Sequence, residues 1–235
     1  MTGRATILAA IGSQLAAVPG SVETRRQYVR SDIHALRNWP KPATTWALLD
    51  KFRERVLGLS CTIEELNDVA AIPKEVARYL AEYELPLSVN GWAEFEVLDW
   101  KSAGITFRSS PVTGESKVGL THAFCAMSET GALMQLSGPA TQAAASLLPE
   151  THIAVVRADR LVGTMEEAWA KLKSETIRQT NRIPRAVNFI AGPSRTGDIE
   201  QTTTIGVHGP RRVHIILLHD RGRPSSLRTD EGGTS

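Results

Sequence analysis

The stretch Val213-His214-Ile215-Ile216-Leu217-Leu218 gives the most direct indication of the fold class. Its apolar residues follow one another with little polar alternation, which is typical of a strand buried on both faces of a parallel sheet. Six stretches upstream also have the composition of strands: Leu87–Val89, Ile105–Phe107, Val118–Ala126, Gly131–Leu136, Ile153–Val156 and Val187–Ala191. The sequence therefore predicts an α/β protein built around a mostly parallel sheet.

Helices are predicted between several of these strands, as crossover connections require. Pro139–Leu148 is rich in alanine, and Thr164 with Glu167 matches a capping box that begins another helix. The strand at Gly131–Leu136 follows the one at Val118–Ala126 directly, which favours a hairpin. We therefore expect a layered α/β fold whose sheet is mixed.

The first 85 residues are predicted to be helical. Apolar residues at helical spacing indicate a helix near residues 7–15, and a polar arm follows at Ser21–Pro42. Later helices are predicted to begin at Thr44 or Thr45, at a capping box formed by Thr62 and Glu65, and at Pro73. The expected organisation is a helical N-terminal region and arm packing on the body at 1–85, an α/β domain at 86–219 and a disordered tail at 220–235.

The composition narrows the classes of function. The chain has 235 residues, a hydrophobic fraction of 42% and a net charge of +2. This charge is too small to indicate a nucleic acid or an anionic membrane as partner. No apolar run approaches the roughly 20 residues of a membrane span, and the N-terminus lacks the features of a signal peptide. We expect a cytoplasmic protein.

The two cysteines, Cys61 and Cys125, stand far apart in the sequence. Two isolated thiols cannot hold a four-thiolate iron–sulfur cluster or a four-cysteine zinc ion. Free thiols in a reducing compartment are the simplest interpretation. His122 and His152 lie at predicted strand positions and are interpreted as structural.

The segment Val187–Glu200 contains the first candidate site. A short strand is followed by a tight turn at Gly192-Pro193, and a loop at the carboxyl end of a strand in an open α/β sheet is a usual ligand site. Hydroxyl, guanidinium and backbone N–H groups there could hold a phosphate or carboxylate. The residues concerned are Gly192, Ser194, Arg195, Thr196 and Gly197. The alternative is a connection whose polar side chains only cap the next element.

The turn Ser128–Gly131 contains the second candidate site. The Glu129 carboxylate could act as a base, accept an acyl group or bind a cation. Thr130 and Gly131 could help to bind the ligand. The alternative is that Thr130 and Gly131 only form a turn and that Glu129 is solvated.

The third candidate is His208 in the Gly-rich turn Gly206–Pro210. It could donate a proton or bind a ligand, although a hydrogen-bonded turn residue is the alternative. Asp198, Glu200 and His208 match no strong metal motif, so no metal is predicted. If the three turns gather at one edge of the sheet, Glu129, Arg195 and His208 should surround one cleft.

Four ordered motifs resemble the LUD (lactate utilization) domain family, in particular its lactate utilization protein C members. They are Ser128–Leu133, Ser146–Val155, Gly192–Glu200 and Gly206–Arg211. The resemblance covers about Leu98–Leu218. It implies a three-layer α/β/α fold similar to NagB, RpiA and the CoA transferases.

The resemblance also implies a function. It suggests a role beside two iron–sulfur proteins in the oxidation of L-lactate to pyruvate, with the clusters on those partners and no cofactor on this chain. The turn Ser128–Gly131 is also similar to the Ser-Glu-Asn-Gly turn of CoA transferases, whose Glu takes up an acyl group. Thr130 stands where that turn has Asn, which weakens the analogy.

Three functions remain open at this point. The first is a subunit of a lactate-oxidizing system that binds a small carboxylate or assists assembly of the complex. The second is a CoA-transferase- or isomerase-like enzyme that acts on a phosphorylated or CoA-linked small acid through Glu129. The third is a non-catalytic regulatory or interaction protein.

Overall fold

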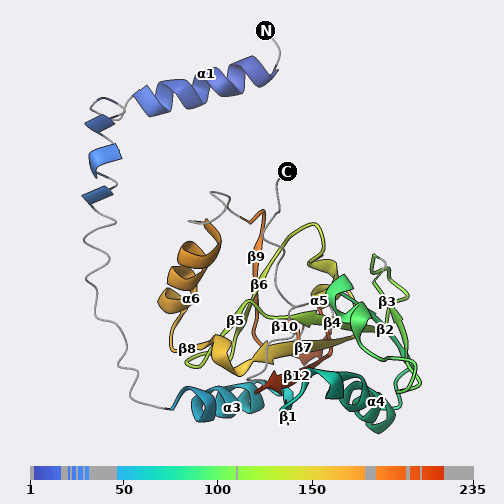
Figure 1. Ribbon diagram of the computed structural model, residues 1–235. Coiled ribbons are helices and arrows are strands. Elements are labelled where there is room, and N and C mark those ends of the chain that lie inside the picture. Colours follow the sequence, from blue (N-terminus) through green and yellow to red (C-terminus); the bar gives the residue numbers. More distant parts are fainter. Residues whose placement is uncertain are drawn as a thin grey trace, which may run out of the picture. The chain divides into compact units, whose positions relative to one another are not determined.

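The structure is a computed structural model that describes residues 3–16, 21, 23–24, 26–28, 30–31, 47–109, 111–177, 184–199, 202–206 and 208–219 (Figure 1). Contacts divide the chain into two compact units, Met1–Ala43 and Thr44–Ser235. The first unit contains α1 (Gly3–Ala16), as the apolar spacing predicted. Much of the predicted arm and all of the predicted tail from residue 220 lie outside the described residues.

The second unit contains the sheets. Its helices are α3 (Leu48–Gly58), η1 (Val69–Ala71), α4 (Ile72–Glu82), η2 (Ala93–Val97), α5 (Ala144–Leu147), η3 (Ala158–Arg160), α6 (Met165–Leu172) and η4 (Lys173–Ile177). Its strands are β1 (Thr62–Leu66), β2 (Ser88–Gly91), β3 (Thr106–Arg108), β4 (Val118–His122), β5 (Cys125–Met127), β6 (Leu133–Leu136), β7 (Thr151–Arg157), β8 (Leu161–Val162), β9 (Val187–Ile190), β10 (Arg195–Ile199), β11 (Thr202–Ile205) and β12 (Arg212–Leu218). Among the residues described, no helix combines the length and apolarity needed to cross a membrane.

The central sheet has six strands in the order β1-β12-β7-β4-β2-β3, and every pair in it is parallel. Strand β12 lies between β1 and β7, and its residues from Val213 to Leu218 are all buried. Burial on both faces explains why this stretch is continuously apolar. The prediction of a parallel α/β sheet is confirmed.

The antiparallel pairs lie outside the central sheet. A four-stranded sheet has the order β8-β5-β6-β9, with β5 and β6 forming the predicted hairpin. The stretch Val118–Ala126 is not one strand, because it leaves the central sheet after His122 and enters the smaller sheet at Cys125. The central sheet is thus purely parallel, whereas the smaller sheet is mixed, because β5 pairs antiparallel with β6 and parallel with β8. A single mixed sheet was predicted.

Three hydrophobic clusters, which lie between successive layers of the fold, show how the layers pack. On one face of the central sheet, Val76 and Leu80 of α4 pack in a cluster with Leu120 and Ile216. On the other face, α3 and the inner side of the smaller sheet form a second cluster. Helix α6 packs on the outer side of the smaller sheet in a third cluster. The three-layer α/β fold is confirmed, with the smaller sheet filling part of one outer layer (Figure 1).

The helix predicted from Thr62 is wrong. Residues Thr62–Leu66 form β1, and each of them has a register partner on β12. A capping box is a local signal, and pairing with a distant, strongly apolar strand overrides it. The central sheet thus begins well before residue 86, so the predicted domain boundary does not separate helical and sheet regions.

Candidate functional site

The three Gly-rich turns gather around the C-terminal end of α3. Gly131 and Gly192 both have positive φ angles, 72° and 81°. A Cβ on Gly131 would lie 3.1 Å from Leu59 Cδ1, and one on Gly192 would lie 2.8 Å from Leu59 O. The third turn joins through Ser194, whose backbone N donates to Pro210 O at 2.9 Å. The sequence prediction that these turns meet agrees with their backbones.

The sequence suggested that Arg195 lies in the tight turn after Gly192-Pro193, but the structure places it in a strand. It begins β10, which pairs with β11 in a two-stranded hairpin that the sequence did not predict. Thr196 and Gly197 belong to the same strand. The exposed Arg195 guanidinium donates to Ser60 Oγ, and Ser60 itself has a positive φ of 62°.

Glu129 is engaged by α6. Its carboxylate accepts from Met165 N at 3.3 Å, and its backbone N donates to Gly163 O at 3.1 Å. A carboxylate at a helix N-terminus stabilises the unpaired N–H groups of the first turn. Thr130 Oγ1 accepts from Ala132 N at 3.2 Å and so shapes the turn. These contacts are structural ones.

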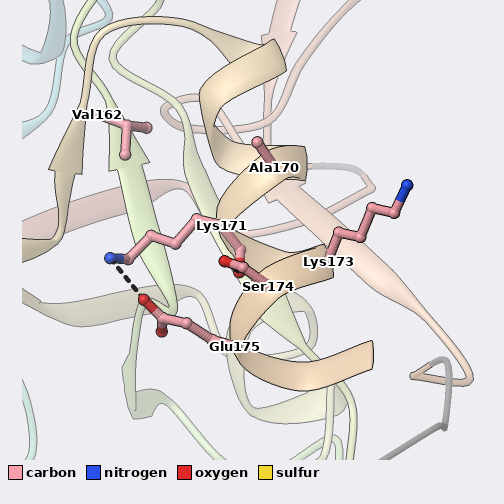
Figure 2. A pocket seen from close by; sticks show the side chains of 6 residues that line it. All are labelled: Val162, Ala170, Lys171, Lys173, Ser174 and Glu175. Carbon is pink, nitrogen blue, oxygen red and sulfur yellow. Dashed lines mark hydrogen bonds and ion pairs between the residues drawn. The ribbon is translucent and has the colours of Figure 1, made fainter. Parts of the chain in front are cut away.

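The structure gives the three predicted side chains separate surroundings. Glu129 contacts α6, Arg195 contacts Ser60, two residues after the end of α3, and His208 is exposed in the turn before β12. Figure 2 shows a hollow beside α6 in which Lys171 Nζ lies 2.8 Å from Glu175 Oε1, while Lys173 points away from that pair. None of the predicted site residues lines this hollow.

The position of these turns in the central sheet also differs from the expectation. Pro210 comes just before β12 and Ser60 just before β1, so the turns meet at the amino edge of the parallel strands. Strand β9, which leads into Gly192, belongs to the smaller sheet. The argument from the carboxyl end of a parallel strand therefore does not apply to this loop.

That argument applies to β2 and β4. The chain leaves β2 for β3 on one side, returns to β4 on the other side of β2, and then continues outward to β7 and β12. The strand order thus reverses between β2 and β4, and in open α/β sheets ligands bind in the crevice at the carboxyl ends of such a pair. This switch point is where a ligand site is expected from the topology.

Three side chains occupy the switch point. His122 is the last residue of β4, and Trp92 and Glu94 follow β2. Glu94 Oε1 lies within hydrogen-bonding distance of His122 Nδ1, and the Trp92 ring meets the imidazole edge to face at 4.8 Å. Trp92 Nε1 in turn donates to Gln142 O at 3.1 Å, which fixes the indole.

The pair has the arrangement of a proton acceptor. A carboxylate only accepts hydrogen bonds, so in the neutral imidazole Nδ1 carries the hydrogen and Nε2 carries the lone pair. The His122 side chain is 35% exposed and that of Glu94 22%, and no described residue bonds Nε2. The predicted strand position of His122 indicated a structural role, and no local pattern connects it with residues 92–94, which become its neighbours only through the strand order.

Two other histidines are buried. His152 Nε2 lies 2.8 Å from Thr121 Oγ1, which also accepts from Gln135 Nε2 at 2.6 Å. Burial lowers the pKa of His152 to about 3, so it stays neutral. His214 Nδ1 lies 2.8 Å from Thr62 Oγ1. Its Nε2 lies 3.4 Å from Glu75 Oε1 but forms no hydrogen bond with it. These groups hold the sheets together.

Metal ligands are not clustered in the part of the chain that the structure describes, where no three His, Cys, Asp or Glu side chains form a candidate site. Cys61 and Cys125 are free and belong to different core clusters. Burial raises the pKa of each thiol to about 11, which disfavours the thiolate that binds metals.

Comparisons with known proteins agree with the fold. The sequence profile described as "LUD domain" matches residues 49–218. The chain is 30% identical over 228 residues, 94% of this chain and 97% of the relative, to lactate utilization protein C of Exiguobacterium sp.. It is 36% identical over 107 residues, 46% of this chain and 44% of the relative, to the protein of that name in a Geobacillus species. A crystal structure of a DUF162 family protein from Deinococcus radiodurans superposes with a TM-score of 0.55 at 24% identity, covering 73% of this chain and 96% of the other.

Proposed function

The chain belongs to the LUD domain family, and on this basis we propose that it takes part in lactate utilization. The single observation that carries the proposal is 30% identity along 94% of the chain to a lactate utilization protein C. The aligned region extends over nearly the full length of both proteins, so it spans the part of the chain that contains the switch point and the three turns. The proposed role is in the oxidation of L-lactate to pyruvate in the cytoplasm.

The proposed role includes iron–sulfur partner proteins. Oxidation of lactate to pyruvate releases two electrons and two protons, and the electrons need an acceptor. Cys61 and Cys125 are buried apart from each other, so the clusters that take the electrons are assigned to the partners. This chain contributes binding of the small carboxylate or assembly of the complex.

Growth on L-lactate tests the proposal. A strain that lacks the gene should fail to grow on L-lactate, and the full chain should restore growth. The tagged chain, purified from lactate-grown cells, should carry proteins whose iron and labile sulfide are measurable. Normal growth of the deletion strain on L-lactate would contradict the proposed role. If the purified chain carried no iron, the proposal of iron–sulfur partner proteins would be contradicted.

A further inference from the structure

We propose that the Glu94–His122 pair at the switch point binds the hydroxyl group of a small 2-hydroxy carboxylate, with His122 Nε2 as the acceptor. This inference names the ligand-binding site of the proposed function and rests on that function for the identity of the ligand. The pair lies at the carboxyl ends of β2 and β4, where the strand order reverses.

The chemistry of the pair selects a hydrogen-bond donor. Because Glu94 engages Nδ1, the free lone pair of the imidazole is on Nε2. Nε2 is not one of the buried atoms that lack a partner, and no described residue bonds it, so it can meet a ligand. A hydroxyl group donates to such a nitrogen, whereas a ketone or an unsubstituted carbon chain does not.

The surroundings hold the acceptor in one orientation. Trp92 continues the ladder of β2, since its backbone N donates to Leu120 O at 3.1 Å. Its ring lies at 88° to the imidazole and its Nε1 is held by Gln142 O. The imidazole is thus fixed on one side by a carboxylate and on another by an aromatic ring, which reduces the entropy lost when a ligand binds.

A cationic side chain that could bind the carboxylate of the ligand lies on β7, the strand next to β4. Val155 of β7 is in register with His122, and Arg157 lies two residues further along β7, on the same face. Two residues of a strand span about 6–7 Å, a distance that a small acid and a long side chain can bridge. Asp159 orients the guanidinium through two hydrogen bonds: its Oδ1 accepts from Arg157 Nε at 3.0 Å and its Oδ2 accepts from Arg157 Nη2 at 3.2 Å.

The chain offers a matched control at the same edge of the sheet. His219 Nε2 lies 2.7 Å from Glu65 Oε2, and the side chains are 28% and 32% exposed, close to the values of the switch-point pair. Strand β1, which carries Glu65, is the edge strand furthest from β2 and β4. A histidine–carboxylate pair as such is therefore present in both places, and only one of them is at the switch point.

Calorimetric titration of the full chain with L-lactate, propionate and pyruvate tests the site. Propionate lacks the hydroxyl group and pyruvate has a carbonyl in its place. The wild type should bind L-lactate about tenfold more tightly than either analogue, the value of one hydrogen bond to a fixed acceptor. His122→Phe should bind all three equally, while His219→Phe should keep the tenfold preference.

A second variant guards against a folding defect in His122→Phe. Glu94→Gln keeps the side-chain volume, but its amide can donate to Nδ1 as well as accept from it, so the tautomer with the acceptor on Nε2 is no longer enforced. The variant should have a reduced preference for L-lactate and an unchanged melting temperature. Equal wild-type affinities for L-lactate and propionate, absence of binding, or a preference that survives in both variants would overturn the inference.

The growth assay separates this inference from the proposed function. If the chain restores growth on L-lactate but binds L-lactate and propionate equally, the function stands and the site is wrong. If the tenfold preference is found but the deletion strain grows normally on L-lactate, the site stands and the function fails.

Discussion

Two histidine–carboxylate pairs lie at the carboxyl edge of the same parallel sheet, and they differ in what else they contact. The Glu65–His219 pair also contacts Arg53, whose guanidinium bonds Glu65 Oε1. Burial by itself would raise the pKa of Glu65, but hydrogen bonds from His219 and Arg53 outweigh it and lower that pKa. The Glu94–His122 pair contacts an aromatic ring, that of Trp92, in place of an arginine.

The difference shows how position in a sheet changes the role of one and the same pair. At the edge strand, Arg53 and His219 both bond one carboxylate, so the pair joins α3, β1 and the end of β12. At the switch point, the carboxylate bonds only the imidazole among the described residues, which leaves the second ring nitrogen for a ligand.

The largest expected change is a loss of folding stability at acid pH, and it limits the pH range in which the two histidine–carboxylate pairs can be compared. Burial lowers the pKa of His152 from 6.5 to about 3, so the unfolded chain binds more protons than the folded chain between these values. Stability should therefore fall as the pH falls through this window, by up to about 5 kcal/mol. Urea titrations at pH 7, 5 and 4 measure it.

A His152→Gln variant provides the control for this acid effect. It should be less stable at pH 7, because the bond to Thr121 changes, and it should lose less stability on acidification than the wild type. An equal pH dependence in both proteins would show that other groups cause the acid sensitivity.

The second prediction concerns the packing of α5, which should affect the Glu94–His122 pair but not the Glu65–His219 pair. A Cβ on Gly119 would lie 2.0 Å from Ala145 O, so Gly119→Ala must displace α5. We expect a loss of about 2–3 kcal/mol in the free energy of unfolding. Because Gln142 precedes α5 and holds the Trp92 indole, the preference for L-lactate should also fall.

Gly58→Ala is the matched control, since nothing lies within 4 Å of a Cβ at that position. It should be neutral or slightly stabilising, because alanine favours the helix. A Gly119→Ala protein with wild-type stability would show that α5 moves freely on β4 and does not position the switch point.

The third prediction concerns the edge pair. Glu65→Gln should cost about 1 kcal/mol, because the ion pair with Arg53 is partly exposed and screened. Since the pKa of Glu65 is lowered, its contribution is present above pH 4.5 and is lost as the pH falls below it. Thermal unfolding at pH 7 and pH 4 measures both statements, and the affinity for L-lactate should not change. A loss of affinity would remove the contrast between the pairs.

The smallest effect is expected at the turn that resembles the CoA-transferase turn. Glu129→Gln keeps an oxygen that can accept from Met165 N, so stability should change by about 0.5 kcal/mol or less. Growth on L-lactate should persist. Loss of growth with unchanged stability would instead favour acyl transfer through the Glu129 carboxylate.

The candidate sites show where prediction from the sequence reached its limit. Turn chemistry placed Gly131 and Gly192 in turns correctly, because both need positive φ. It could not show that Glu129 is bound to α6 or that Arg195 begins a hairpin, because those contacts depend on distant parts of the chain. All of the predicted site roles stay a prediction: those of Glu129, Thr130, Gly131, Gly192, Ser194, Arg195, Thr196, Gly197 and His208.

The fold shows the same limit. The apolar run at Val213–Leu218 and the capping box at Thr164 were interpreted correctly, since burial on both faces and helix capping leave local patterns. Thr62–Leu66 was assigned to a helix, because its partner strand lies some 150 residues further along the chain and no local pattern records it. Pairing between strands that are distant in the sequence is therefore the feature of the fold that is hardest to predict from a single sequence.

The layered α/β class, the apolar strands such as Val213–Leu218 and the family can thus be recognised in the sequence alone, because periodicity, turn residues and motifs are properties of short stretches. Which strands are neighbours in the sheets becomes known from the folded chain. That order places Glu94 and His122 side by side although 28 positions separate them, and it sets the other histidine–carboxylate pair at an edge strand. The physical reason is that hydrogen bonding between strands and burial of the apolar faces act between residues that are distant in the sequence.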